Sequence, residues 1–255
     1  MPEFTIKGIE LRRMNVESAL RFLKEEGENM FSDPFPHILA LPEKWVTEPI
    51  EEDSSIISML CDLSGKHDSV IVPGSFTVKR DDRWYNSAPV ISGGKILGWQ
   101  DKISLYLDEK KKYTKGGNIH TFSTPYGRIA APVCYDLDFP YFCKIVSSQG
   151  AAIIINPSLI REAFHSEWEL YVKARSLENR LCVASINSIS EPFNGNSIIS
   201  CPFQDGYGAR IKVHRGVGTS VNAAVDPEAI VSMAKIRSEE DPGEYSFNGG
   251  TVDDL

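Results

Sequence analysis

The sequence has no uninterrupted apolar run that approaches the ~18 residues of a membrane-spanning helix. It also has no long basic run, and its 35 aspartates and glutamates outnumber its 27 lysines and arginines, for a net charge of −8. Nucleic-acid binding needs a surface that neutralises phosphates, which this balance does not offer. We therefore expect a soluble, cytoplasmic protein whose partners include neither a membrane nor a nucleic acid.

Cysteine is scarce and has no paired spacing. The chain of 255 residues holds five cysteines, at positions 61, 134, 143, 182 and 201, and none of them forms a C-x-x-C pair. An odd number without paired spacing indicates neither a disulfide framework nor a zinc site. At least one thiol is therefore free, and its role depends on its neighbours.

Internal repeats, low-complexity stretches and convincing linkers are absent as well. We interpret residues 1–237 as a single domain, followed by an acidic tail over residues 238–255 that is poor in periodicity. The domain contains alternating helical and strand patterns. Helices are predicted over residues 16–23, 56–63, 139–148 and 164–172, and strands over residues 4–11, 37–41, 69–72, 76–78, 88–91, 95–99, 119–122, 128–133, 151–155, 181–186, 197–199, 209–213 and 220–225.

The alternation predicts the fold class. Helices that follow strands cover one face of a sheet, and the inserted hairpins make each sheet mixed. Two such sheets bury their remaining faces against each other. We therefore predict an α/β fold, a four-layer α-β-β-α sandwich.

Three chemically reactive side chains follow predicted strands. Cys134 ends an apolar run and precedes a predicted helix, whose N-terminus would favour the thiolate. Glu43 and Lys102 stand at the ends of two other strands. Because the carboxyl ends of strands border the binding crevice in open α/β sheets, the three side chains can converge there. The alternatives are a core cysteine, a solvated loop acid and a surface lysine.

The segments around these residues resemble the motifs of the nitrilase superfamily, the carbon–nitrogen hydrolases. The similarity covers roughly residues 37 to 226. Its motifs are Leu39-Ala40-Leu41-Pro42-Glu43, the lysine motif 95–105, the nucleophile motif 126–136, Gly150-Ala151-Ala152 with Asn156-Pro157-Ser158, Trp168 with 174–179, and Gly195-Asn196-Ser197. The resemblance independently implies the same four-layer sandwich, and it implies a homodimer or larger assembly.

The resemblance also implies the roles of the site residues. Cys134 is expected to be the nucleophile, Glu43 the general base and acid, and Lys102 an oxyanion donor together with the backbone N–H of Tyr135. Glu109 lies where the family has a second acid, although it also fits a solvated run of charges. Asp138 and Ser158 are expected near the oxyanion and substrate. No metal or other cofactor is implied.

Two departures from the family's usual motifs bear on the substrate. Ser104 stands where a histidine often follows the lysine, and Asp138 begins the stretch that often reads Arg-Phe-Pro-Glu. An acid near the crevice repels anionic substrates, so we expect neutral or cationic linear amides to be preferred over N-carbamoyl amino acids or dicarboxylic monoamides. The alternative is that Asp138 is only a helix N-cap.

The expected function is hydrolysis of a small non-peptide amide through a cysteine thioester. An acyltransferase or a nitrile hydrolase can use the same three residues. A catalytically silent binding or interaction protein that keeps only the scaffold is the alternative of another class.

Overall fold

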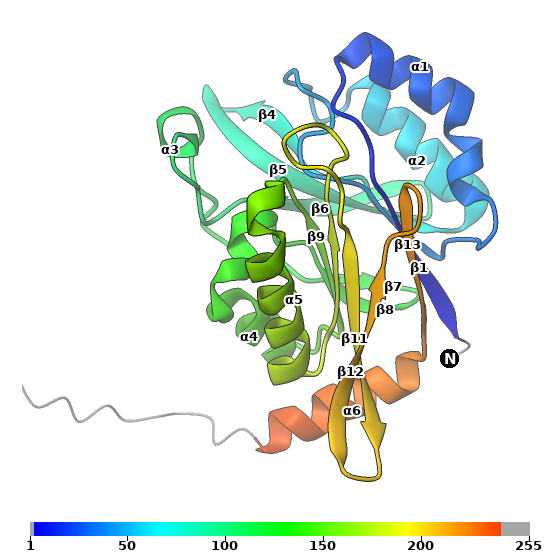
Figure 1. Cartoon of the computed structure of the whole chain (residues 1–255). Helices are drawn as coiled ribbons and strands as arrows, with labels where there is room; N and C mark the ends of the chain where they lie inside the picture. The colour runs from blue at the N-terminus through cyan, green and yellow to red at the C-terminus, as the bar shows by residue number, and fades with distance from the viewer. Residues whose placement is uncertain (1–2, 241–255) are drawn as a thin grey trace, which may run out of the picture.

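The computed structural model describes residues 3–240, which form an α/β structure (Figure 1). Its α-helices and 3₁₀ helices are α1 (Val16–Glu26), η1 (Glu28–Phe31), α2 (Ser55–His67), α3 (Glu109–Lys112), η2 (Cys134–Asp138), α4 (Pro140–Ser148), η3 (Glu162–Phe164), α5 (His165–Asn179) and α6 (Pro227–Glu240). Its strands are β1 (Phe4–Ile9), β2 (Ile38–Ala40), β3 (Val70–Val72), β4 (Phe76–Arg80), β5 (Arg83–Ser92), β6 (Lys95–Asp101), β7 (Phe122–Thr124), β8 (Gly127–Ala130), β9 (Ile153–Pro157), β10 (Cys182–Ile186), β11 (Ile198–Asp205), β12 (Gly208–Arg215) and β13 (Ser220–Val225).

The strands form two mixed sheets. The first has the order β13-β1-β2-β3-β5-β4, with β6 paired to β5, and the second has the order β12-β11-β10-β9-β8-β7. Parallel pairs β1–β2, β2–β3, β8–β9 and β9–β10 lie inside the sheets, and antiparallel pairs complete the edges. The strand before Glu43 is β2, inside the first sheet, and the strand before Cys134 is β8, next to the edge strand β7 of the second sheet.

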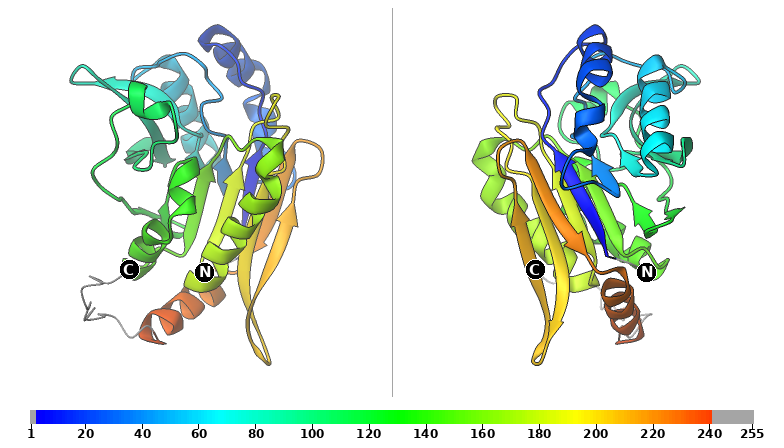
Figure 2. Two further views of the ribbon diagram at one scale, coloured as in Figure 1. Left: turned by 60° about the vertical axis from the view of Figure 1, so that its left-hand side comes forward. Right: turned by 90° about the vertical axis from the view of Figure 1, so that its right-hand side faces the viewer.

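Side-chain alternation along the central strands builds the layers. In β2, Ile38 and Ala40 point into the core between the sheets, whereas Leu39 points to the core under α1 and α2. In β9, Ile153 and Ile155 face the shared core, and Ile154 packs with side chains of α4 and α5. Figure 2 shows α1 and α2 on one side of the strands and α5 on the other. The predicted four-layer α-β-β-α sandwich is confirmed.

Local signals in the sequence fix several element ends. Asn15 caps α1, because its side chain accepts a hydrogen bond from the backbone N–H of Ser18 at 2.9 Å. The last helix was not predicted: α6 runs over Pro227–Glu240 and crosses the end of the molecule (Figure 1). It thus continues three residues past the predicted start of the acidic tail, and residues 241–255 of that tail lie outside the described residues.

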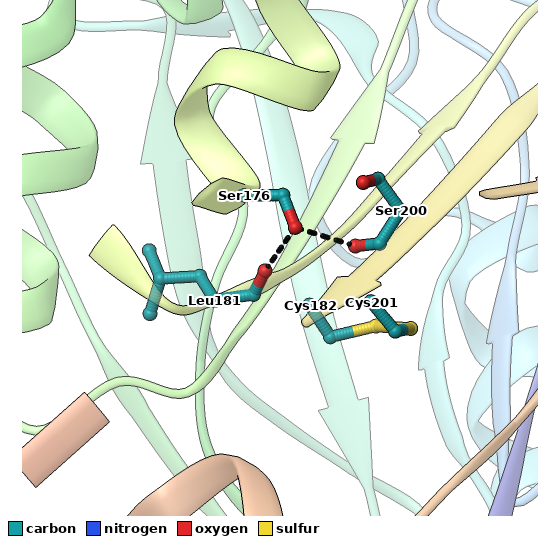
Figure 3. Close-up of a disulfide and its surroundings, with 5 residues drawn as sticks. All are labelled: Ser176, Leu181, Cys182, Ser200 and Cys201. Carbon is teal, nitrogen blue, oxygen red and sulfur yellow. Dashed lines mark hydrogen bonds between the residues drawn. A yellow bond between two sulfur atoms is a disulfide. The ribbon is translucent and has the colours of Figure 1, made fainter. Parts of the chain in front are cut away.

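Two of the five cysteines are paired, which the sequence analysis did not expect. A disulfide joins Cys182 of β10 to Cys201 of β11 (Figure 3). The antiparallel register sets Val183 opposite Ser200, so the two cysteines face each other across the strands. A separation of 19 residues is not a motif, and only strand pairing brings them together. Cys61, Cys134 and Cys143 are free.

No helix within residues 3–240 combines the length and the apolarity that crossing a bilayer demands.

Candidate active site

Glu43 lies three residues beyond β2, in a turn held against the end of β3. The backbone of Glu43 bridges to Ser75, and the N–H of Lys44 donates to the Ser75 carbonyl at 2.9 Å. Gly74 has a φ of 87°, and a Cβ at this position would lie 2.0 Å from the Pro42 carbonyl oxygen, so only glycine permits this close approach. The turn buries the Glu43 side chain between the sheets, with 1% of the residue exposed.

Lys102 follows β6 and points at the same carboxylate. Its Nζ donates to Glu43 Oε1 at 3.0 Å and pairs with Glu109 Oε2 at 2.8 Å, and 2% of the side chain is exposed. Burial lowers the pKa of Lys102, but electrostatic interactions with Glu43, Cys134 and Glu109 outweigh burial and hold the pKa well above its usual value. The side chain is therefore a buried ammonium.

Cys134 begins η2 in a left-handed backbone conformation, with a φ of 46°. Such a conformation is uncommon for a residue with a Cβ and is concentrated at functional turns. The Glu43 side chain and the backbone N–H of Leu159 both interact with the thiol. Cys134, Glu43 and Lys102, which are far apart in the sequence, thus converge as the strand-end positions predict.

The helix that follows Cys134 begins farther from the thiol than the sequence suggests. The 3₁₀ helix η2 intervenes, and α4 begins six residues after Cys134, at Pro140. Burial first, and then the charge of Glu43, raise the pKa of Cys134 well above its ordinary range, and Lys102 and the Leu159 N–H offset this only in part. The resting thiol is protonated and needs a base.

Asp136 fixes the nucleophile turn to the lysine loop. Its Oδ2 accepts the Val133 N–H at 3.0 Å, and its Oδ1 accepts the N–H groups of Ile103 at 3.1 Å and Ser104 at 2.6 Å. Burial raises the pKa of Asp136 to about 6, against the opposing effect of the three N–H donors and of Lys102. One carboxyl group therefore sets the relative position of the Lys102 and Cys134 segments.

Glu109, at the start of α3, belongs to the site and is not a solvated charge. Its Oε2 forms an ion pair with the Lys102 ammonium. Its Oε1 accepts hydrogen bonds from the Lys44 ammonium at 2.9 Å and from the Asn86 amide at 3.3 Å. The Asn86 amide also donates to Glu43 at 2.7 Å. Burial raises the pKa of Glu109, but the two ammonium groups outweigh it and hold the pKa at about 2.

Sequence analysis missed Lys44 and Asn86. Lys44 directly follows Glu43, so its proximity to the site was available as a signal. Asn86 lies in β5, a strand that the sequence predicts only over residues 88–91, and an asparagine there carries no motif. Only the pairing of β5 with β4 and β6 brings its amide to the two carboxylates.

Tyr135 contributes an aromatic contact beside the nucleophile. Its ring packs edge-on against Tyr106 at 4.9 Å and against Phe139 at 5.2 Å between ring centroids. Tyr106 also donates its backbone N–H to Glu109 at 3.0 Å. Half-exposed aromatic rings thus adjoin the Cys134 and Glu109 segments.

Asp138 ends η2, and the N-cap alternative for it is wrong. Phe139 is the N-cap of α4 and has extended backbone angles, because the following Pro140 disfavours helical angles in the residue before it. The Asp138 carbonyl accepts a hydrogen bond from the Arg175 guanidinium of α5. Burial raises the pKa of the Asp138 carboxyl, and the charge of Arg175 lowers it in part.

Ser158 is buried behind the nucleophile. Its hydroxyl donates to Asn156 Oδ1 at 2.6 Å and lies 2.9 Å from the Ser185 hydroxyl. The Asn156 amide in turn donates to the carbonyls of Pro132 and Cys134. The Ser158 hydroxyl therefore supports the turn that carries Cys134.

A cavity of about 480 Å³ opens beside the lysine loop. Its lining residues are Ile103, Ser104, Leu105, Lys110, Tyr113 and Lys115. Within residues 3–240, no group of three or more His, Cys, Asp or Glu side chains is arranged to hold a metal ion.

Comparison with known proteins decides the family. The sequence matches the carbon-nitrogen hydrolase family over residues 1–232. The chain belongs to this family. It is 27% identical over 206 residues to a hydrolase of Schizosaccharomyces pombe, a match that covers 74% of this chain and 62% of that relative. It is 24% identical over 194 residues to an omega-amidase of Xenopus laevis, covering 67% of each chain.

The fold of this carbon-nitrogen hydrolase is that of the nitrilase superfamily. The crystal structure of Nit3 from Saccharomyces cerevisiae, a member of that superfamily, matches with a TM-score of 0.76 at 21% identity, over 92% of this chain and 94% of the other. The family resemblance inferred from the sequence motifs is confirmed by the family match over residues 1–232. Because the match spans less than two thirds of the S. pombe hydrolase, the activity of this chain is inferred from its own site.

Proposed function

We propose that the protein is an amidohydrolase that cleaves a small linear amide through a thioester at Cys134, with Glu43 and Lys102 completing the triad. The interaction of the Cys134 thiol with the Glu43 carboxylate, which accepts a hydrogen bond from Lys102 at 3.0 Å, carries this proposal. A carboxylate that lies beside a protonated thiol and is fixed by an ammonium is arranged to accept the thiol proton.

In the first half of the reaction, Cys134 Sγ attacks the amide carbon while its proton passes to Glu43. The carbonyl oxygen becomes an oxyanion held by the Lys102 ammonium and the backbone N–H of Tyr135. One preorganised donor of this kind contributes about 3 kcal/mol of transition-state stabilisation. As the carbon–nitrogen bond breaks, Glu43 returns the proton to the leaving nitrogen, and ammonia or an amine departs from the thioester.

In the second half, water replaces the departed amine. Glu43 takes a proton from this water as its oxygen attacks the thioester carbon, and the carbon–sulfur bond breaks. The proton on Glu43 then returns to the Cys134 sulfur, and the carboxylic acid is released. In an acyltransferase, an amine attacks at this step instead, and in a nitrile hydrolase the first attack is on a nitrile carbon.

The catalytically silent alternative is disfavoured by the cost of burial. Removing Lys102 and Glu43 from water costs several kcal/mol per ion, and a well-packed apolar pair is often equally stable or more stable. A scaffold protein has no need for this arrangement beside a strained cysteine. A catalyst does, because the charges act on the transition state.

The first prediction tests the triad. Cys134→Ala, Glu43→Gln and Lys102→Ala are each expected to reduce kcat on a panel of linear amides, scored by ammonia release, by on the order of 10²-fold or more. Cys61→Ala is the control, because Cys61 is a free thiol on α2.

Iodoacetamide is expected to modify Cys134 first, with parallel loss of activity. Full activity in the Cys134 variant would exclude the thioester, and transfer of the acyl group to an added amine in preference to water would identify an acyltransferase.

A further inference from the structure

Lys44 is a second lysine in the site, largely shielded from solvent and next to Glu43 in the chain. Its backbone adopts a left-handed conformation with a φ of 44°, and its carbonyl accepts a hydrogen bond from Arg13 Nε at 3.2 Å. These constraints direct the side chain inward, where 17% of it is exposed. Its Nζ lies 2.9 Å from Glu109 Oε1 and 4.0 Å from Glu43 Oε1.

Lys44 balances the charge of the buried cluster. Two carboxylates, Glu43 and Glu109, face two ammonium groups, Lys102 and Lys44, while the Cys134 thiol is neutral. Beyond this cluster, the ring of Tyr113 lies 5.3 Å from Lys44 Nζ, and its hydroxyl is hydrogen-bonded to Thr77. Asp136 faces the cluster from η2, and the charge of Lys102 lowers the pKa of its buried carboxyl group. Without Lys44, the two carboxylates face one ammonium group, and one negative charge is uncompensated. The pKa of a carboxyl group in the cluster then rises.

The consequence for Lys102 follows from the shared carboxylate. Glu109 pairs with Lys102 through one oxygen and with Lys44 through the other. While Glu109 is ionised, it competes with Glu43 for the Lys102 ammonium, so Lys102 does not pair with Glu43 alone. If Glu109 is protonated, Lys102 pairs with Glu43 alone. Glu43 then becomes a weaker base for the thiol, and Lys102 becomes a less available oxyanion donor.

We propose that Lys44 is a positioning residue that keeps Glu109 ionised and fixed on Lys102, and so keeps Glu43 free to act as the base for Cys134. This inference rests on the proposed amidohydrolase function. It also explains why a lysine is buried here although its ammonium has no place in the bond-breaking steps.

The test compares Lys44→Gln, Lys44→Arg and Lys66→Gln. Lys66 is the matched control, because it forms an ion pair of 2.7 Å with Glu28 on the surface, with 62% of its side chain exposed. Two pH profiles are measured for each variant and for the native protein: kcat/KM by ammonia release, and the rate of Cys134 alkylation by iodoacetamide, followed by mass spectrometry. The second profile needs no substrate.

In Lys44→Gln, the acid limb of both profiles is expected to move to higher pH by about 1 to 2 units, because a cation within 4 Å of a carboxylate is removed. At higher pH, kcat/KM is expected to return to within about threefold of the native value. Lys44→Arg keeps the charge and is expected to keep the native acid limb, as is Lys66→Gln.

Coincident acid limbs in Lys44→Gln and the native protein would overturn the proposal, and so would an equal shift in Lys44→Arg. If Lys44→Gln does not fold, the Lys44→Arg profile decides alone: a native acid limb supports the charge role, and a shifted limb contradicts it. If the native protein releases no ammonia from any amide, the proposed function fails, while the alkylation profiles still decide the role of Lys44.

Discussion

The Asp138 carboxyl group lies at the end of η2, the 3₁₀ helix that Cys134 begins, and is not part of the buried cluster. Its backbone carbonyl is held by Arg175, and its side chain is not the cap of α4. It is half-buried beside the ring of Tyr135, whose hydroxyl pKa it helps to raise after burial. A negative charge at this place disfavours an anionic group on the substrate and favours a cationic one.

The second prediction is therefore about substrate charge. For one linear amide with neutral, cationic and carboxylate analogues, kcat/KM is expected to be lowest for the carboxylate. Asp138→Asn is expected to reduce the cationic-to-carboxylate ratio by about five- to tenfold, the value of one partly exposed charge pair of about 1 kcal/mol. Asp108→Asn is the control, because Asp108 is exposed and paired with Lys111. A native preference for the carboxylate analogue would contradict the prediction and would direct attention to Lys110 and Lys115 in the adjoining cavity.

At the scale of elements, η2 determines the geometry of the site. This 3₁₀ helix carries Cys134 at one end and Asp138 at the other, and Asp136 in its middle joins it to the lysine loop. Arg175 of α5 adds a second brace through the carbonyls of Leu137 and Asp138. Since η2 holds the nucleophile in a left-handed conformation, its braces oppose the strain of that turn.

The third prediction concerns the Asp136 brace. Asp136→Ala leaves three backbone N–H groups without their acceptor, at about 1 to 3 kcal/mol for each that remains buried and unpaired. We expect a loss of about 3 kcal/mol in the free energy of unfolding, measured in urea, with a fall in kcat larger than the rise in KM. Asp136→Asn keeps one acceptor oxygen and is expected to lose less on both measures. A variant as stable and active as the native protein would show that the brace is dispensable.

The sequence predicts the strand ends well and the fine structure of η2 poorly. Glu43, Lys102 and Cys134 were predicted because apolar runs stop next to them, and the two mixed sheets were predicted because helical and strand patterns alternate. The 3₁₀ helix was missed because its five residues are too short for periodicity. The roles of Lys44 and Asn86 depend on which strands pair, and a single sequence does not state this.

At the scale of the whole molecule, α4 and α5 leave apolar side chains facing solvent. These helices cover the outer face of the second sheet and lie side by side (Figure 1). The exposed large apolar residues on them and on η3 are Tyr141, Ile145, Phe164, Leu170, Tyr171 and Leu177. Exposed apolar patches of this kind mark sites of protein association, and a self-complementary patch gives a twofold dimer. We propose that the carbon-nitrogen hydrolase forms a homodimer through this surface.

The last prediction connects this surface to the site. Static light scattering at micromolar concentration is expected to give twice the chain mass, and the double variant Tyr141→Glu, Leu170→Glu is expected to give a monomer, because a charge on each helix must then be buried without a partner. Leu97→Glu on β6 places the same charge on another exposed leucine and is expected to leave the dimer intact.

Since Arg175 braces η2 from α5, the monomeric variant is expected to keep its circular dichroism spectrum but lose about tenfold in kcat/KM. A native monomer would refute the dimer, and a fully active monomeric variant would show that α5 holds η2 without help from a partner subunit.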